Sequence, residues 1–302
     1  IPVGKEKSGM SNGVGSQSMV SPLRRVVVKR PADAFVSAAK LEAEWRDLAF
    51  TARPDLDRAV QEHAAFVAAL EAMGAEVLAL PAAAGTTLDS IYTHDPGLAT
   101  KAGVVVFNMG KPQRRQEGLA LRAALQGWGV PVLGEVSAPA TAEGGDLLWV
   151  DENTLVAGRS HRTNAAGIAR IRELTAPLGV TVVEAALPWW RGQAELIHLL
   201  SLISPVAEDL AVVYRPLMPI PLVDLLVERG YRLLDVPEEE FVAMGPNVLA
   251  LAPRRVLMLR GLPRTRAALE AAGCTVTEYA GDEISHKGGG GPTCLTRPLL
   301  RG

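Results

Sequence analysis

LLWVDENTLVAGRSHRTNAAGIARIRELTAPLGVTVVEAA, residues 147–186, contains one complete strand–strand–helix–strand unit. The apolar runs at 147–150 and 154–158 are short and bounded by turn residues, which is typical of buried strands. Residues 163–177 have the length and spacing of a helix, and 180–186 is again a short apolar run. We therefore predict two strands, a helix and a third strand in this order.

The same order of elements recurs on both sides of this segment, in units of about 50 residues, a period typical of a repeated structural module. This recurrence predicts an α/β protein built from strand–strand–helix–strand modules. Residues 194–203 are expected to form a turn or a short strand. The other strands are expected at 24–29, 76–81, 102–108, 130–134, 209–214, 231–235, 247–252, 255–259 and 274–279, and the other helices at 33–49, 55–73, 114–126, 219–229 and 263–272.

The chain shows no internal division into domains. No low-complexity linker interrupts residues 21–302, so we expect one compact domain there. Residues 1–20 are rich in glycine, serine, lysine and methionine, and we expect a disordered leader or a tag.

The composition is that of an ordinary globular protein. Hydrophobic residues make up 48% of the chain and charged residues 21%, and the net charge of 31 − 33 is −2. Such a balance offers no basic surface to nucleic acid or anionic lipid. No apolar run reaches the roughly 18 to 20 residues of a membrane span, and the start lacks the order of a signal peptide. Neither Gly-x-Gly-x-x-Gly nor a phosphate-binding loop motif occurs at a strand-to-helix turn, which excludes the common nucleotide folds.

Two cysteines, Cys274 and Cys294, do not make a disulfide framework, and the spacings of metal-binding motifs are absent. We therefore expect a reducing compartment, the cytoplasm. Cys274 follows a helix that ends at Gly273 and begins a strand, where a small apolar side chain suffices. Cys294 differs because it lies in a loop that begins with four glycines, Gly288 to Gly291, followed by Pro292. It is our candidate nucleophile, although single cysteines are more often buried hydrophobic residues.

A thiol needs a base or a positive neighbour to become a thiolate. His198 is the candidate, although a lone histidine in an apolar segment is more often a core residue. Glu143-Gly-Gly-Asp146 places two acids around a turn just before a strand, flanked by apolar or small residues. In isolation, this motif could equally be a turn with solvated carboxylates.

Further charged residues suggest a zwitterionic ligand. Asp89 and Asp95 are separated by six positions, and Arg114 and Arg162 follow them in the chain. Acids complement a cationic group, whereas arginines bind a carboxylate with two hydrogen bonds. The set fits an amino acid with a basic side chain, although each charge alone would be read as surface decoration.

Together these residues resemble the guanidino-group-modifying superfamily of dimethylarginine dimethylaminohydrolase, arginine deiminase and the amidinotransferases, over about residues 22–300. Glu143-Gly-Gly-Asp146 is similar to the family's acid-Gly-Gly-Asp motif, His198-Leu199 to its His-Leu motif, and Gly291-Pro-Thr-Cys294 to its nucleophile loop. Asp89, Asp95, Arg114 and Arg162-Thr-Asn are spaced as in the dimethylargininase branch. The resemblance implies the pentein fold, with five modules around a pseudo-fivefold axis.

The resemblance also implies roles. Cys294 would attack the guanidinium carbon, and His198 would protonate the departing amine and later activate water; the covalent intermediate would be a thiouronium and the product citrulline. The substrate would be bound by Asp95 and Glu143 at the guanidinium, Arg114 and Arg162 at the α-carboxylate, Asp89 at the α-ammonium, Gly288 in the nucleophile loop, and Asp146 supporting the turn. No metal or organic cofactor is implied. The partner is a small guanidino amino acid, and a homodimer is allowed.

Three features set this chain apart from the dimethylargininase branch or from its relatives. Arginine deiminases carry an acid two residues after the histidine, where this chain has Leu200, which favours an N-alkylated guanidine such as methylated arginine. His94 stands where relatives have an arginine or an acid, and the C-terminal end looks more like the deiminase branch. The alternatives are an arginine deiminase, an amidinotransferase and a non-catalytic pentein that binds partners.

Residues 32–53 are expected to form a mobile flap over the site.

Overall fold

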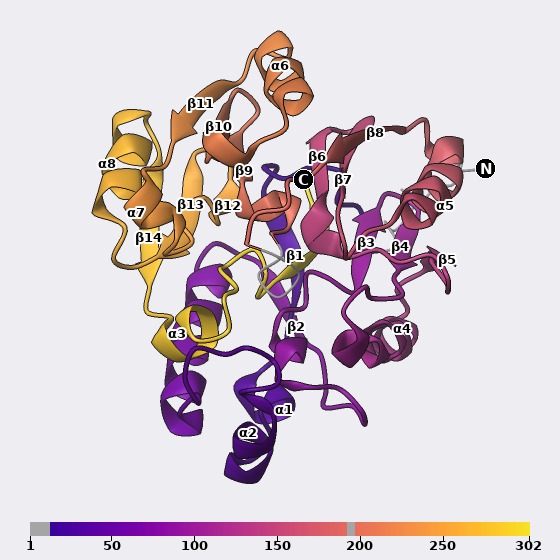
Figure 1. The fold of residues 1–302 in the computed structure, drawn as a ribbon, viewed down its shortest axis with the longest axis vertical. Helices are drawn as coiled ribbons and strands as arrows, with labels where there is room; N and C mark the ends of the chain where they lie inside the picture. The colour runs from indigo at the N-terminus through magenta and orange to yellow at the C-terminus, as the bar shows by residue number, and fades with distance from the viewer. Residues whose placement is uncertain (1–12, 192–196) are drawn as a thin grey trace, which may run out of the picture.

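The computed structural model describes residues 13–191 and 197–302, which form five three-stranded sheets arranged around a common centre (Figure 1). In strand order the sheets are β15-β1-β2, β3-β4-β5, β6-β7-β8, β11-β10-β9 and β12-β13-β14. The strands are β1 (Leu23–Val28), β2 (Glu76–Ala79), β3 (Gly97–Thr100), β4 (Gly103–Val106), β5 (Val132–Glu135), β6 (Leu147–Asp151), β7 (Thr154–Arg159), β8 (Thr181–Ala186), β9 (Ile203–Ala207), β10 (Leu210–Val213), β11 (Arg232–Asp235), β12 (Leu249–Ala252), β13 (Arg255–Leu259), β14 (Thr275–Tyr279) and β15 (Arg297–Arg301).

Each sheet repeats one pattern of pairing. The middle strand pairs antiparallel with one neighbour and parallel with the other, as β7 does with β6 and β8. A parallel pair needs a crossover connection, and here a helix supplies it. The predicted strand–strand–helix–strand modules are therefore confirmed. The crossover helices are α3 (Leu56–Glu71), α4 (Gln116–Gly127), α5 (Ala165–Thr175), α6 (Ile220–Glu228) and α8 (Pro263–Ala271).

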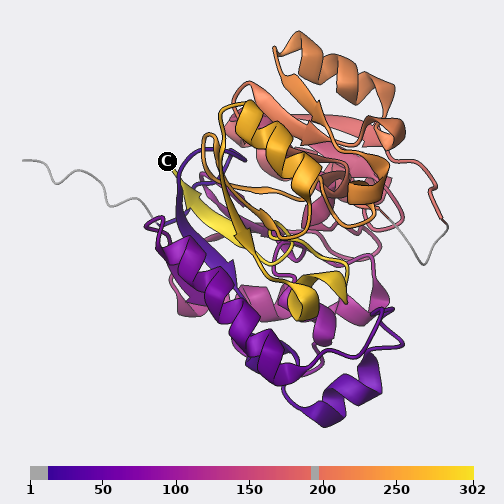
Figure 2. The same cartoon turned by 90° about the vertical axis from the view of Figure 1, so that its left-hand side faces the viewer.

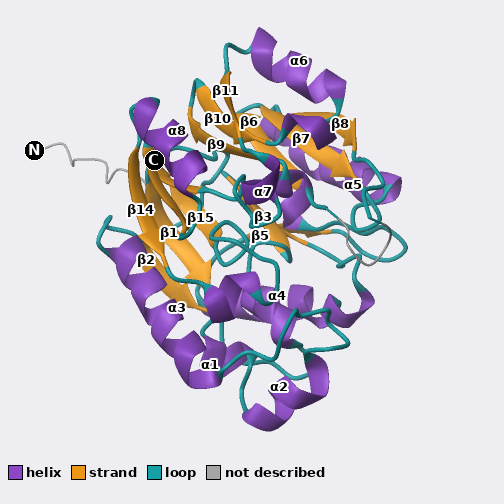
Figure 3. Cartoon of the chain, turned by 60° about the vertical axis from the view of Figure 1, so that its left-hand side comes forward, coloured by secondary structure: helices purple, strands orange, loops and turns teal. Residues whose placement is uncertain are grey.

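The helices lie on the outside and the strands inside (Figure 3). α3 shows why: Asp55 caps its N-terminus by accepting from the Arg58 amide, and one face buries Phe66 and Leu70 against the sheet. Strands such as β4 (GVVV) are buried along their whole length, as strands covered on both faces should be. No helix in the described part of the chain is long and apolar enough to cross a membrane.

The C-terminal strand β15 completes the first module, because it pairs antiparallel with β1 (Figure 2). We did not predict this strand, since Pro298 and two arginines break its apolar pattern. Proline is tolerated there because β15 is the edge strand of its sheet. Gly302 also donates its amide to the Pro22 carbonyl at 2.9 Å, so the end of β15 lies beside the start of β1.

Several predicted boundaries need correction. The helix expected at 33–49 is two short helices, α1 (Pro31–Ala34) and α2 (Ala38–Glu44), because Val36 has a positive φ of 61° and Ser37 caps a new helix. β3 and β9 were also missed, and a further short helix, α7 (Glu238–Phe241), follows β11.

The expected disordered leader at 1–20 is wrong for residues 13–20. Val14 and Val20 are buried, and the Gly15 amide donates to the Leu299 carbonyl at 2.7 Å, beside β15. Residues 1–12 lie outside the described residues, as do 192–196 within the turn expected at 194–203.

Candidate active site

A cavity of ≈ 400 Å³ collects the residues predicted to do chemistry. Its wall includes Asp89, Asp95, Arg114, Arg162, His198, Gly288 and Cys294. The site groups share one position in the module, since each lies on the connection between two sheets, a few residues before the first strand of the next module. This is the position of Asp95 before β3, Glu143 before β6, His198 before β9 and Cys294 before β15.

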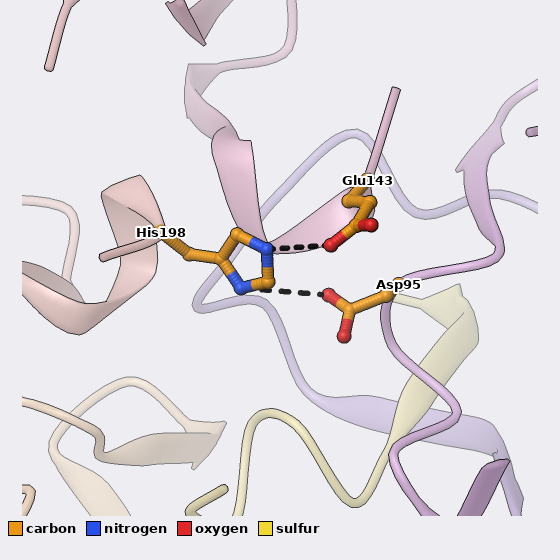
Figure 4. A group of neighbouring side chains, drawn as sticks. All are labelled: Asp95, Glu143 and His198. Carbon is orange, nitrogen blue, oxygen red and sulfur yellow. Dashed lines mark hydrogen bonds and ion pairs between the residues drawn. The ribbon is translucent and has the colours of Figure 1, made fainter. Parts of the chain in front are cut away.

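His198 lies between two buried carboxylates (Figure 4). Its Nε2 is 2.8 Å from Oε2 of Glu143, and its Nδ1 is 3.9 Å from Oδ1 of Asp95. Burial lowers the pKa of His198, but the negative charges of Asp95, Asp146 and Glu143 outweigh burial and raise the pKa to about 9. The imidazole is therefore protonated at neutral pH and can act as a general acid.

Glu143 is fully buried and held from several sides. Its carboxylate accepts from the Lys111 amide at 2.9 Å and from Nη1 of Arg162 at 3.0 Å, in addition to its contact with His198. Burial alone would raise its pKa, but the hydrogen bond from His198 and the charge of Arg162 hold the pKa at about 2. Glu143 is thus ionised across the working pH range.

Asp95 is buried and ionised for a similar reason. Nη1 of Arg114 donates to its Oδ2 at 2.6 Å, and the Gly145 amide donates to its Oδ1 at 2.9 Å. The Arg114 and His198 charges outweigh burial and lower the pKa of Asp95 well below its usual range. A side chain at 145 would meet Nδ1 of His198 at 2.5 Å, so the Gly-Gly turn lets the histidine and this carboxylate approach each other.

Asp146 does not line the cavity but fixes the backbone beside His198. Its Oδ1 accepts from the Leu199 amide at 3.1 Å, and its Oδ2 accepts from the Ser160 hydroxyl at 2.6 Å. Burial raises the pKa of Asp146. These contacts join the end of the Gly-Gly turn to the segments at Ser160 and Leu199, and the role of Asp146 in supporting the turn stays a prediction.

The Cys294 thiol faces the cavity, and both the Asn247 side chain and the Gly291 backbone hydrogen-bond to it. Nδ2 of Asn247 lies 3.2 Å from Sγ, while Oδ1 of Asn247 accepts from the Thr293 amide at 3.0 Å. Burial and the Asp95 carboxylate raise the pKa of the thiol to about 11, despite the hydrogen bond from Asn247. The other cysteine, Cys274, packs in the hydrophobic core, as expected.

The glycine loop packs closely against Tyr92. A Cβ at Gly288 would lie 2.1 Å from Oη of Tyr92, and one at Gly290 would lie 2.3 Å from the Tyr92 ring. The Tyr92 hydroxyl donates to the Ile284 carbonyl at 3.3 Å. The glycines therefore allow the nucleophile loop to approach a buried aromatic ring.

Arg114 and Asp89 are both already paired. All three nitrogens of Arg114 donate to protein oxygens, including Asp95, both carboxylate oxygens of Glu117 and the Tyr92 carbonyl. Oδ2 of Asp89 accepts from Nζ of Lys111 at 2.6 Å. The role predicted for Arg114, clamping a substrate carboxylate, thus competes with its existing bonds.

Neither His94 nor Leu200 is part of the cavity wall, although the His94 amide donates to the Cys294 carbonyl at 3.1 Å. Nδ1 of His94 bonds to the Thr296 carbonyl at 2.8 Å, and burial together with the Arg297 charge lowers the pKa of His94 to about 3, so the ring is neutral. Leu200 is 2% exposed in the core and is not part of the cavity wall, whereas Ser201 is.

Sequence reasoning missed Lys111, Asn247 and an apolar wall. Trp190, Ile197, Phe241 and Met244 line one side of the cavity. Lys111 and Asn247 each stand next to a proline in a connection between elements, which is a weak signal. Residues 32–53 contribute Leu48 and Ala49 to the wall, and their predicted mobility remains a prediction.

Asp95, Glu143 and His198 are also the residues best placed to hold a metal ion, because their ligand atoms lie within 4.8 Å of one another. However, Arg114 and Arg162 already neutralise the two carboxylates. Such surroundings suit a protonated histidine better than a divalent cation.

The chain is similar to known proteins over most of its length. A family sequence model described as "N,N dimethylarginine dimethylhydrolase, eukaryotic" matches residues 39–301. The N(G),N(G)-dimethylarginine dimethylaminohydrolase of Streptomyces coelicolor is 28% identical over 252 residues, covering 83% of this chain and 88% of the relative. The arginine deiminase of Listeria welshimeri is 27% identical over 253 residues, but the match covers only 61% of that enzyme.

Solved structures share the fold. A mutant dimethylarginine dimethylaminohydrolase of Pseudomonas aeruginosa in complex with citrulline superposes with a TM-score of 0.75 at 22% identity, covering 93% of this chain and all of that one. The N-terminal domain of ArgZ, a cyanobacterial arginine dihydrolase, gives 0.77 at 21% identity, with 92% and 98% covered. The amidinotransferase SxtG of Microseira wollei gives 0.76 at 17% identity, with 96% and 97% covered. The fold is the pentein fold, as predicted.

Proposed function

This chain belongs to the N,N dimethylarginine dimethylhydrolase family, and we propose that it is a cysteine-dependent hydrolase of a guanidinium group. The observation that carries the proposal is the meeting of Cys294, His198 and the Asp95 carboxylate at one cavity. A guanidinium is a resonance-stabilised cation that resists water, so it needs opposite charge and a strong nucleophile. The cavity supplies both. At the reacting end of the substrate, the first candidate is an N-methylated guanidinium, as in methylated arginine.

The positive charge of the substrate activates the Cys294 nucleophile. In the free protein, the Asp95 carboxylate helps to keep the Cys294 thiol protonated. A guanidinium held against Asp95 would neutralise that charge and stabilise the thiolate, lowering the thiol pKa where the attack occurs. The thiol releases its proton to solvent when the guanidinium binds. The thiolate then adds to the guanidinium carbon, and the sulfur–carbon bond of a tetrahedral adduct forms.

His198 moves the protons. As an imidazolium, it gives its proton to the departing amine, and the C–N bond breaks to leave a thiouronium on Cys294. The neutral imidazole then takes a proton from water, which attacks the same carbon. Collapse of this second adduct releases Cys294 and a ureido product, citrulline when the substrate is a methylated arginine. Glu143, paired with His198 at 2.8 Å, holds the ring and stabilises its charge throughout.

The other predicted residues surround this chemistry. Arg162 is 17% exposed and lines the cavity, so it can meet a substrate carboxylate while it pairs with Glu143. For Arg114 we propose a positioning role, because it pairs with Asp95 and Glu117 inside the protein. Gly288 keeps the nucleophile loop against Tyr92.

Arginine deimination and amidine transfer use the same groups and remain the alternatives. The apolar wall of Trp190, Phe241 and Met244 supports an N-alkyl group on the substrate. The Leu200 argument now rests only on the absence of a carboxylate at that position, since the leucine lies in the core. Both cysteines are unpaired, which supports a reducing compartment such as the cytoplasm.

The test is product formation from dimethylarginine, monomethylarginine and arginine, with detection of citrulline and of the released amine or ammonia. Wild type and Cys274→Ser should turn over the same compounds, because Cys274 is a core residue. Cys294→Ser should lose activity by at least about a thousandfold, as expected when a covalent nucleophile is removed. Two outcomes would contradict the proposal. One is that Cys294→Ser turns over substrate at the wild-type rate, and the other is that neither wild type nor any variant turns over any guanidino acid.

A further inference from the structure

Lys111 places an ammonium group inside the cavity wall. Its Nζ donates to Oδ2 of Asp89 at 2.6 Å and lies 3.4 Å from the Leu48 carbonyl. The Lys111 side chain is 19% exposed and that of Asp89 is 6% exposed, so the pair is largely shielded from water. A carboxylate and a carbonyl together form an ammonium-binding site, and this chain fills it with its own lysine.

The position of this lysine is fixed by its backbone. Pro112 follows it and restricts Lys111 to extended dihedral angles, as its ψ of 116° shows. The Lys111 amide donates to Oε1 of Glu143 at 2.9 Å. Backbone and side chain of one residue therefore connect the His198 end of the cavity with the Asp89 end.

The cavity then offers a ligand fewer free negative charges than positive ones. Among the described residues that line the cavity, only Asp89 and Asp95 carry carboxylates. Asp95 lies with His198 and Cys294, where the guanidinium must be placed, and Asp89 already holds Lys111. Lys111 and Arg162 both line the wall and favour a carboxylate on the ligand. A second positive group on the ligand would face an occupied carboxylate and a lysine.

We propose that the preferred substrates are guanidino carboxylic acids that lack an α-ammonium, and that Lys111 is the residue that sets this preference. This inference rests on the proposed hydrolysis of a guanidinium group and concerns only the other end of the substrate. An α-ammonium would have to displace Lys111 from Asp89 or bind beside it against charge repulsion.

Two pairs of compounds that differ only in the α-ammonium test the wild-type protein. Arginine is compared with 5-guanidinopentanoate, and dimethylarginine with the dimethylated form of 5-guanidinopentanoate, through kcat/KM for ureido product. In the pair that reacts, the compound without the ammonium should have a kcat/KM higher by about tenfold or more. The reason is that an α-ammonium must give up or displace the charge-assisted hydrogen bond between Lys111 and Asp89. Equal or better turnover of the α-amino compound overturns the inference but leaves the proposed function intact. Turnover of none of the four contradicts the proposed function itself.

Lys111→Met tests the residue directly. It keeps an unbranched chain of similar length, removes the ammonium and leaves the Asp89 carboxylate open. The preference within each pair should shift toward the α-amino compound by about tenfold or more. Lys101→Met is the matched control, because Lys101 is exposed in the turn between β3 and β4, and it should keep the wild-type preference. If Lys111→Met unfolds, the wild-type comparison still decides. An unchanged preference in folded Lys111→Met would overturn the role of Lys111.

Discussion

Cys294 and His198 titrate in an order that leaves the resting site without a thiolate–imidazolium ion pair. The pKa of the thiol is raised to about 11 and that of the imidazole to about 9. Between pH 7 and pH 9, the free protein therefore holds a neutral thiol beside an imidazolium. Such a thiol reacts slowly with oxidants and alkylating agents, and it gains its nucleophilicity only when a cation binds.

A titration of the thiolate tests this order of pKa values. The difference in ultraviolet absorbance between wild type and Cys294→Ser should show a midpoint near pH 11. Asp95→Asn should lower that midpoint, because the carboxylate that disfavours the thiolate is gone. The kcat/KM of wild type should rise from neutral pH toward an apparent pKa of about 9 and fall again near 11. A midpoint at or below pH 8 in wild type would show that the resting site already holds the thiolate.

At the scale of elements, short apolar runs and helix caps were enough to predict most strands and the crossover helices. β15 was not predictable from its own residues, because its Pro298 and arginines are accepted only at the edge of a sheet beside β1. Likewise, the break between α1 and α2 depends on a single positive φ at Val36.

In the site, too, some features could be predicted from local sequence and others could not. Cys294, His198, Glu143 and Asp95 were found because their motifs are local in the sequence. The pairings of Lys111 with Asp89 and of Asn247 with Cys294 join residues 22 and 47 positions apart, on different connections, so no local pattern reveals them. The same holds for Arg114, whose partners became visible only in the folded chain.

The glycine loop before Cys294 should tolerate no side chain at its start. Gly288→Ala would place a Cβ 2.1 Å from the hydroxyl of Tyr92, which is buried, so the loop must shift and carry Cys294 with it. We expect kcat/KM to fall by about a hundredfold, the scale of a misplacement of about 1 Å in an active site.

Gly127→Ala is the matched control for this glycine. Gly127 ends α4 with nothing within 4 Å of the added Cβ, so activity should be unchanged and the free energy of unfolding equal or higher by up to about 1 kcal/mol. Wild-type kcat/KM in Gly288→Ala would show that Tyr92 yields and that the loop is not fixed by this contact.

At the scale of the whole molecule, the site belongs to no single module. Asp95, Glu143, His198, Asn247 and Cys294 come from the five connections between successive sheets. The same backbone position, repeated around the axis, thus aims different side chains at one cavity. A substitution that separates two neighbouring sheets should therefore reduce activity even when both sheets stay folded.

Because β15 pairs with β1 in the first sheet, residues 14 and 302 lie close together. They can therefore be joined, and the chain can be opened at another place. A circular permutant that joins Gly302 to Val14 through a short glycine–serine linker and opens between Lys101 and Ala102 breaks only an exposed turn. It should unfold cooperatively and keep kcat/KM within about threefold of wild type, since tolerated permutations preserve the fold. Opening the same joined chain between Gly289 and Gly290 would free the segment that carries Cys294, and that permutant should be inactive although its sheets are complete.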